Sequence, residues 1–273
     1  HNPVDHMGII VHVEVLLKKP AVSDSFLKNL AKQISSAFQS RSLLLNRVYQ
    51  ETSSFRVCIC EAVDSGQVLS DGFIIVDEGT ELAFHFYHPA GVEMGRFQTN
   101  GLTDDQERYK LTVYPQPNPS SSWDSLVYEE QRQYDILYEL LVMQRLSNPS
   151  TGQPANPDIL NCNRLVLLTG PPGTGKTTLC RALANKMAIR CEKRVFLAEI
   201  NCQNILSKWF SESGKLIQGL FDELSKAVAD SDDLIFILFD EIESLLINRA
   251  NLIGSSEPSD SIRVILILLM TKC

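Results

Sequence analysis

The stretch Gly170–Thr177 reads GPPGTGKT, and it predicts how the second half of the chain folds. It follows the apolar run Leu165–Leu168 and precedes the helix-like run Thr178–Ala184. A glycine-rich turn between a strand and a helix matches the phosphate-binding pattern GxxxxGK[ST] in its proper context. Glycines let backbone N–H groups turn toward an anion, and the helix directs its positive N-terminus at the same anion. We therefore predict a phosphate-binding loop made of Gly170, Pro171, Pro172, Gly173, Thr174, Gly175, Lys176 and Thr177.

A pair of acidic residues gives a second, independent signal. The continuous apolar run Leu234–Phe239 ends at Asp240 and Glu241. At the end of a parallel strand these carboxylates would face the nucleotide crevice. We expect Lys176 to reach the β- and γ-phosphates of ATP as a catalytic residue, and Thr177 and Asp240 to hold Mg²⁺. Glu241 is the expected catalytic base; a solvated strand end is the alternative for both acids.

The loop Ser207–Lys215 reads SKWFSESGK and lies between these two motifs. Adjacent aromatic residues in a polar loop have two interpretations. Trp209 and Phe210 either pack on the sheet, or they project into the channel of a ring and grip an extended polypeptide. Aromatic rings suit such a grip because they give a large contact area at small entropic cost. Lys208 would add contacts to backbone carbonyls or to acidic substrate.

The order of segments around these motifs predicts the fold class. Strand-like runs at 164–169, 195–200 and 234–239 alternate with helix-like runs at 176–188 and 213–229. Such alternation predicts an α/β fold, a parallel sheet with flanking crossover helices. A further amphipathic helix is expected over Ser125–Leu146.

The first region has a different pattern. Short strand-like runs occur at Val11–Val15, Phe55–Cys60 and Ala83–Tyr87, and a helical pattern covers Asp24–Phe38. We predict a small α+β domain over residues 1–113, a Pro/Ser-rich linker over 114–122 and a partial ATPase domain over 123–273.

Composition limits the partners. The 273 residues carry a net charge of −8 with a pI near 5.2, which argues against direct binding of nucleic acid. No apolar run is long enough to span a bilayer, so no membrane partner is expected. Seven scattered cysteines fit free thiols in a reducing compartment. Cys58 and Cys60 share a strand face, so a pair of metal ligands is the alternative for these two residues.

Because the chain begins with His1, we expect a fragment.

Several segments together resemble the pachytene checkpoint protein 2 (thyroid receptor-interacting protein 13) family of AAA+ ATPases. They are the phosphate loop with Asp240 and Glu241, the SKWFSESGK loop, and the stretches Trp123–Glu129 and Glu257–Val264. The resemblance implies a P-loop AAA+ core, incomplete here, after a small α+β N-terminal domain.

The resemblance also implies an activity. Members form homo-hexamers that use ATP and Mg²⁺ to remodel HORMA-domain proteins in meiotic recombination, chromosome synapsis and spindle checkpoint control. It implies that residues 1–113 recognise a client or adaptor, and that the protein works on chromosomes in the nucleus and in the cytoplasm. The sequence does not indicate which client or adaptor is bound.

Family members continue with a sensor strand, an arginine finger and a helical lid, which these 273 residues do not include. We therefore expect a truncated chain with a weak ATPase, and an exposed apolar tail over 265–273. The alternative function is a nucleotide-binding isoform or a partner-binding fragment without effective hydrolysis. A nucleic-acid helicase or clamp loader fits the acidic pI and the Trp-Phe loop poorly.

Overall fold

Two five-stranded sheets, one in each of two units, organise the described part of the chain in the computed structural model. One unit comprises residues 1–89 with 127–135, and the other comprises residues 90–126 with 136–273. No helix in the part of the chain that the structure describes is both long and apolar enough to cross a membrane. The described residues are 8–19, 22–64, 67–69, 72–90, 109–116, 123–128, 132–147, 164–202, 218–224, 226, 233–240, 242 and 263–270.

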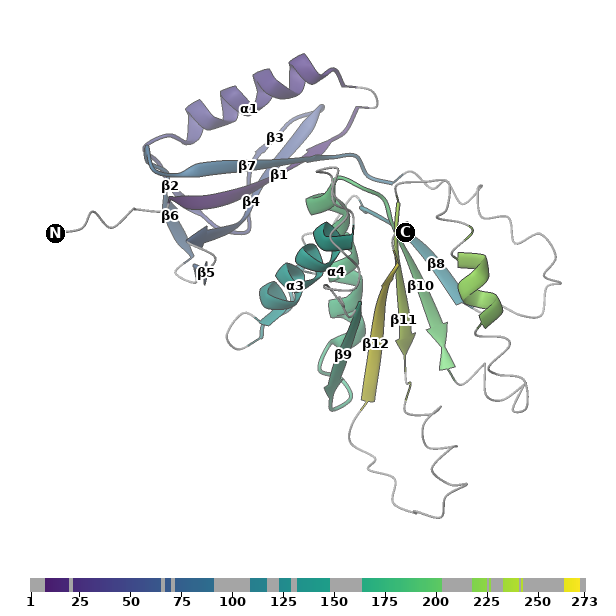
Figure 1. Ribbon diagram of the computed structural model, residues 1–273. Helices are drawn as coiled ribbons and strands as arrows, with labels where there is room; N and C mark the ends of the chain where they lie inside the picture. Colours follow the sequence, from purple (N-terminus) through teal and green to yellow (C-terminus); the bar gives the residue numbers. More distant parts are fainter. Residues whose placement is uncertain are drawn as a thin grey trace, which may run out of the picture. The chain divides into compact units, whose positions relative to one another are not determined.

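The sheet of the first unit has the strand order β3-β4-β1-β7, and the short strand β5 also pairs with β4 (Figure 1). β1 runs antiparallel to β4 and parallel to β7. β2 and β6 form a separate two-stranded sheet. The strands are β1 (Ile9–Leu17), β2 (Ser42–Leu44), β3 (Arg47–Glu51), β4 (Phe55–Asp64), β5 (Gln67–Val68), β6 (Phe73–Ile75) and β7 (Glu81–Tyr87).

One helix, α1 (Asp24–Phe38), covers the apolar face of this sheet. It begins where the Ser23 hydroxyl accepts a hydrogen bond from the N–H of Phe26, as expected for an N-cap. The buried helix residues Leu30, Ile34 and Phe38 pack with alternate residues of the strands. The helix and the three strands predicted for this region are confirmed. The strand side of this core includes Val11, Val13, Val15, Val57 and Ile59.

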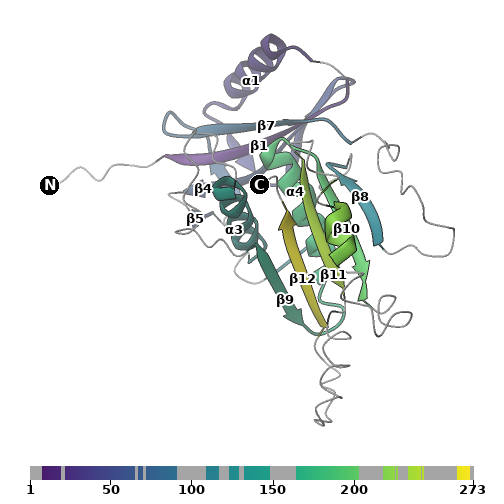
Figure 2. The ribbon, with the colours of Figure 1, turned by 45° about the vertical axis from the view of Figure 1, so that its right-hand side comes forward.

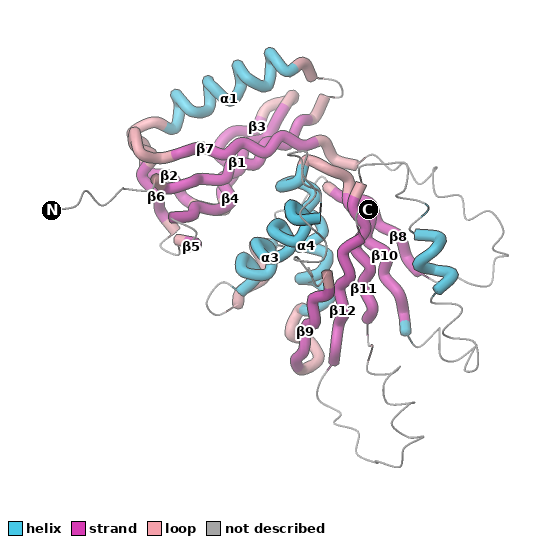
Figure 3. Tube along the Cα trace, viewed as in Figure 1, coloured by secondary structure: helices cyan, strands magenta, loops and turns pink. Residues whose placement is uncertain are grey.

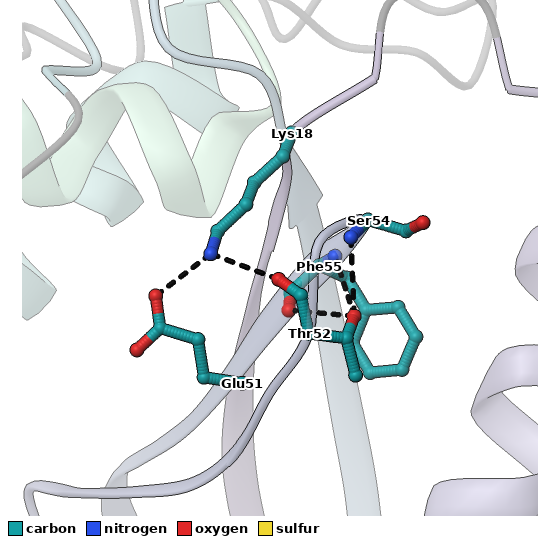
Figure 4. Close-up of polar contacts among 5 residues, drawn as sticks. All are labelled: Lys18, Glu51, Thr52, Ser54 and Phe55. Carbon is teal, nitrogen blue, oxygen red and sulfur yellow. Dashed lines mark hydrogen bonds and ion pairs between the residues drawn. The ribbon is translucent and has the colours of Figure 1, made fainter.

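Polar contacts hold the β3–β4 turn against the end of β1 (Figure 4). The Thr52 hydroxyl accepts hydrogen bonds from the N–H groups of Ser54 and Phe55. The ammonium of Lys18 donates to the carbonyl of Thr52 at 2.9 Å and to the carboxylate of Glu51 at 2.7 Å. The ion pair with Lys18 lowers the pKa of Glu51. The turn therefore closes by local capping, with no glycine in it.

The opposite face of this sheet is polar. His12 and His85 stack there, with 2.9 Å between His12 Nδ1 and His85 Nε2, and Glu14 is buried. Cys58 and Cys60 form no disulfide, and their sulfurs are 3.8 Å apart, in agreement with the predicted shared face. Among the described residues no group of three or more His, Cys, Asp or Glu side chains is arranged to hold a metal ion.

The sheet of the second unit has the order β8-β10-β11-β12-β9 (Figure 2). β10 and β11 are parallel, whereas β8 and β12 run antiparallel to their neighbours. The described residues 218–224 are helical. The remaining elements are β8 (Tyr109–Tyr114), α3 (Arg132–Ser147), β9 (Leu165–Gly170), α4 (Lys176–Cys191), β10 (Val195–Asn201), β11 (Leu234–Asp240) and β12 (Arg263–Met270).

Both faces of β11 are covered, as its continuous apolar sequence predicts. Ile235, Ile237 and Phe239 pack with Leu220 and Leu224 of the 218–224 helix on one face. Alternate residues point to the other face, where α4 contacts the sheet. Asp240 shares this second face, so it lies on the side of the sheet that α4 occupies.

The predicted α/β core is confirmed, but its sheet is mixed and not purely parallel. The tail expected to be exposed forms β12, which pairs with β11 on one side and β9 on the other (Figure 3). An apolar run suits a central strand in either direction, because apolar side chains carry no information about strand polarity. Residues 265–270 of the predicted tail are therefore strand with a partner on each side, while residues 271–273 lie outside the described part of the chain.

Two predicted boundaries also differ from the structure. β8 pairs with β10, so residues 109–113, which were predicted to belong to the first domain, lie in the sheet of the second unit. α3 begins at Arg132, later than the predicted Ser125. In both cases the predicted kind of element is right and only its boundary is wrong. Contacts with segments far away in the sequence determine these boundaries. Of the predicted linker, residues 117–122 lie outside the described part of the chain.

Replacing Ile267 by proline tests the position of β12. Ile267 is opposite Leu238 of β11 and Val166 of β9. Proline in a central strand removes a ladder hydrogen bond and prevents regular pairing. We expect Ile267→Pro to abolish cooperative thermal unfolding of the second unit, measured by circular dichroism, whereas Ile267→Val should leave it nearly unchanged. Equal unfolding curves for the two variants would show that β12 is not a central strand.

Candidate nucleotide-binding site

The loop Gly170–Thr177 joins the end of β9 to the start of α4, as predicted. Gly173 and Gly175 have φ of 81° and 84°, a region that residues with a Cβ rarely adopt. Gly175 is also the N-cap of α4, and no side chain caps the helix. Backbone N–H groups of the first turn are therefore available to an anion, and the helix dipole adds a positive potential.

The ammonium of Lys176 lies over this loop. It donates hydrogen bonds to the carbonyls of Gly170 at 2.9 Å and Pro171 at 2.7 Å, and it is 3.2 Å from the hydroxyl of Thr174. The charge is thus held within reach of the anion site by neutral acceptors. Exchange of these acceptors for phosphate oxygens would be favourable, because hydrogen bonds between two charged groups are stronger.

The two predicted magnesium ligands meet although they are far apart in sequence. The Thr177 hydroxyl, in the first turn of α4, donates to Oδ2 of Asp240, at the end of β11, across 3.2 Å. Hydroxyl and carboxylate oxygens are ligands that suit Mg²⁺. Together with the cationic Lys176 and the uncapped helix, this donor set fits a Mg²⁺–triphosphate. The ligand roles themselves stay predictions.

The structure describes some of the remaining predicted site residues and not others. Pro171, Pro172 and Thr174 lie in the loop, and Thr174 donates to the carbonyl of Pro171 at 3.0 Å. Glu241, Lys208, Trp209 and Phe210 lie outside the described residues.

A second polar contact between α4 and the sheet was not predicted. Arg181 donates two hydrogen bonds to Glu199 of β10, at 2.9 and 2.6 Å. The sequence carries a signal for it. Arg181 is four residues after Thr177, on the same helix face, and Glu199 is the only charged residue in the strand Val195–Asn201.

Cys180 is a buried thiol beside the site. Burial is the main cause that raises its pKa, and the negative charge of Asp240 contributes next. Cys180 therefore stays protonated at neutral pH and is an inert packing residue, since only the thiolate is an effective nucleophile or metal ligand.

The residues just before α3 fall within the helix predicted over Ser125–Leu146. Val127 is 91% exposed and precedes the start of α3, so the helix prediction is wrong for it. Trp123 is the anchored residue of this segment: it is 1% exposed, and the ammonium of Lys186 lies 5.7 Å from the centre of its ring.

Comparisons with known proteins agree with this geometry. Residues 166–271 match the model of the ATPase family associated with various cellular activities (AAA). The chain is 32% identical over 272 residues to a pachytene checkpoint protein 2 homolog of Arabidopsis thaliana, covering 95% of this chain and 56% of that protein. It is 42% identical over 156 residues to the Homo sapiens homolog, covering 56% of this chain and 35% of that protein.

A solved structure shows the same relation. The structure of PCH-2 from Caenorhabditis elegans aligns with a TM-score of 0.62 and 28% identity, over 89% of this chain and 62% of that chain. The chain thus spans between about a third and three fifths of the length of these relatives. The matched residues include the phosphate loop and the strand that ends at Asp240. With this sequence similarity and this fold, the chain belongs to the pachytene checkpoint protein 2 family of AAA ATPases.

Proposed function

We propose that this chain carries the partner-recognition domain and the nucleotide-binding part of an ATP-driven remodeller of HORMA-domain proteins. The observation that carries the proposal is the 3.2 Å contact between Thr177 and Asp240 at the uncapped start of α4. It unites the phosphate loop with the acidic strand end, the combination on which ATP hydrolysis depends. Membership of the pachytene checkpoint protein 2 family supports the choice of client.

Each residue of the site has a separate role in this proposal. The N–H groups of the loop and the Lys176 ammonium bind the β- and γ-phosphates and orient them. Thr177 and Asp240 would hold Mg²⁺, which neutralises charge on the phosphates when bound. Glu241 orients the attacking water and accepts its proton. The roles of Lys176 and Glu241 are catalytic, since both groups touch the reacting atoms.

The remaining features act on the client. The N-terminal α+β domain, built on the sheet β3-β4-β1-β7, recognises a HORMA-domain protein or its adaptor. Lys208, Trp209 and Phe210 grip an extended client segment in the channel of a homo-hexamer, where broad aromatic contact tolerates many sequences. The whole protein acts in meiotic recombination, synapsis and spindle checkpoint control, on chromosomes and in the cytoplasm, without direct contact to nucleic acid or membrane.

A comparison of two variants of the whole protein tests this function. Trp209→Ala should retain basal ATP hydrolysis but lose conversion of a HORMA-domain client from its closed to its open form, because only the grip is changed. Glu241→Gln should bind ATP but lose both activities, with turnover reduced by about 10²–10⁴-fold, the usual contribution of a general base. Phosphate release and ion-exchange separation of the two client forms measure these effects.

Two outcomes would contradict the proposal. Normal client conversion by Trp209→Ala would return Trp209 to a packing role on the sheet. ATP binding without hydrolysis or conversion in the unmodified protein would favour the alternative of a nucleotide-binding or partner-binding product.

A further inference from the structure

The bidentate pair of Arg181 and Glu199 connects the phosphate-binding helix to the neighbouring strand. Arg181 Nε is 2.9 Å from Glu199 Oε1, and a terminal nitrogen of the same guanidinium is 2.6 Å from Oε2. Two parallel hydrogen bonds restrict direction as well as distance. The pair therefore sets the orientation of α4 relative to β10.

Water reaches the two partners of this pair unequally. The side chain of Arg181 is 45% exposed, and that of Glu199 is 15% exposed. Exposed ion pairs usually add little to the free energy of unfolding unless their geometry is bidentate, as it is here. The pair can therefore hold α4 in a fixed position on β10 as well as stabilise the contact.

The location of the pair indicates what it positions. Arg181 follows Thr177 by one helical turn, so both side chains project from the same face of α4. On the sheet, Glu199 of β10 is opposite Leu238 of the neighbouring strand β11. Leu238 precedes Asp240 by two residues, so Glu199 and Asp240 lie close together on the same face of the sheet. The contacts Arg181–Glu199 and Thr177–Asp240 are thus successive links between one helix face and two adjacent strands.

Electrostatics place Arg181 in the same environment. The pKa of Arg181 is raised, mainly by its hydrogen bond to Glu199, and the charge of Asp240 is among the further causes. Tyr114 of β8 lies close by, and burial followed by the charge of Glu199 raises its pKa to about 12. The positive charge of Arg181 thus acts on Asp240 as well as on Glu199.

We propose that Arg181, through Glu199, is a positioning residue for the Mg²⁺ ligands Thr177 and Asp240. By fixing the second turn of α4 against β10, it keeps the Thr177 hydroxyl beside the Asp240 carboxylate. The inference rests on the proposed nucleotide-binding function. It predicts that loss of Arg181 weakens the part of ATP affinity that requires Mg²⁺, while Lys176 and the loop amides still bind metal-free ATP.

The test measures the dissociation constant of ATP by calorimetry, once with MgCl₂ and once with EDTA. The ratio of the two constants reports how strongly metal and nucleotide cooperate. In Arg181→Met this ratio should fall by about 10-fold or more, the usual effect of losing a partner that orients a metal ligand. Glu199→Gln should give a similar fall, and Arg181→Lys a smaller one, since an ammonium cannot form the planar fork.

The chain offers a matched control. Arg194 forms an equivalent bidentate pair with Asp233, at 3.0 and 2.6 Å, and its exposure is similar at 43%. This pair lies at the opposite ends of β10 and β11, away from the phosphate loop. Arg194→Met should therefore leave the ratio unchanged, even if it lowers the unfolding temperature as much as Arg181→Met does.

The outcomes separate the inference from the proposed function. An unchanged ratio in a folded Arg181→Met or Glu199→Gln chain that still binds ATP would overturn the positioning role alone. An equal fall in Arg194→Met would also overturn it, because the effect would then be general. If the unmodified chain bound no ATP in either buffer, the proposed function would fail and this inference with it. Should Arg181→Met not fold, Arg181→Lys and Glu199→Gln decide the question.

Discussion

Lys176→Ala is expected to lower the affinity for ATP by about 100-fold or more. The ammonium, which donates to the carbonyls of Gly170 and Pro171, would contact the β- and γ-phosphates in the bound state. Hydrogen bonds to charged groups contribute roughly 1.5–3 kcal/mol each, so two of them account for a loss of this size. Titration with ATP and MgCl₂, followed by calorimetry, measures the change directly.

The control for this variant is Lys226→Ala. Lys226 is an exposed lysine outside the loop, so its loss changes the net charge equally without touching the phosphates. The unfolding temperature of both variants should stay close to that of the unmodified chain, because Lys176 bonds only the exposed loop. Equal ATP affinity in Lys176→Ala and Lys226→Ala would remove Lys176 from the site.

Phe236→Ala is expected to destabilise the second unit by roughly 3–5 kcal/mol. Phe236 is fully buried in β11, between β10 and β12, and truncation of a buried aromatic residue leaves a cavity that the sheet cannot close. Urea unfolding followed by the fluorescence of the buried Trp123 would measure the loss. A Trp209→Phe background limits the signal to Trp123, since the chain has two tryptophans.

Leu167→Ala is the matched control in the same sheet. Leu167 of β9 is 59% exposed, and substitutions at such positions usually change stability by less than about 0.5 kcal/mol. A similar loss for both variants would mean that the second unit does not have its core around β11. Because the chain has two units, the transition of each unit should be fitted separately.

Local chemistry made much of the fold predictable. The GPPGTGKT loop is read correctly because glycine conformation, helix start and strand end all depend on residues within a few positions of it. The same holds for α1, whose Ser23 cap and spacing of Leu30, Ile34 and Phe38 are visible in sequence. β11 follows from a short continuous apolar run, which is typical of a strand buried on both faces.

The meeting of Thr177 with Asp240 was also predictable, though 63 positions separate them. Parallel strands joined by crossover helices bring their carboxyl ends to one edge of the sheet, so order along the chain indicates proximity. The residues of the SKWFSESGK loop and Glu241 lie outside the described part, and their roles stay predictions.

By itself the sequence determined the local elements, the phosphate loop and the family of this protein, because each depends on neighbouring residues or on a motif of definite spacing. Only the tertiary structure decided that β12 lies antiparallel between β9 and β11 and that β8 belongs to the second sheet. It also decided that Arg181 forms its ion pair with Glu199. The reason is physical: strand direction, edge partner and ion-pair partner are chosen by competition among distant segments in three dimensions. An apolar or charged residue fits several of those choices equally well until the chain has folded.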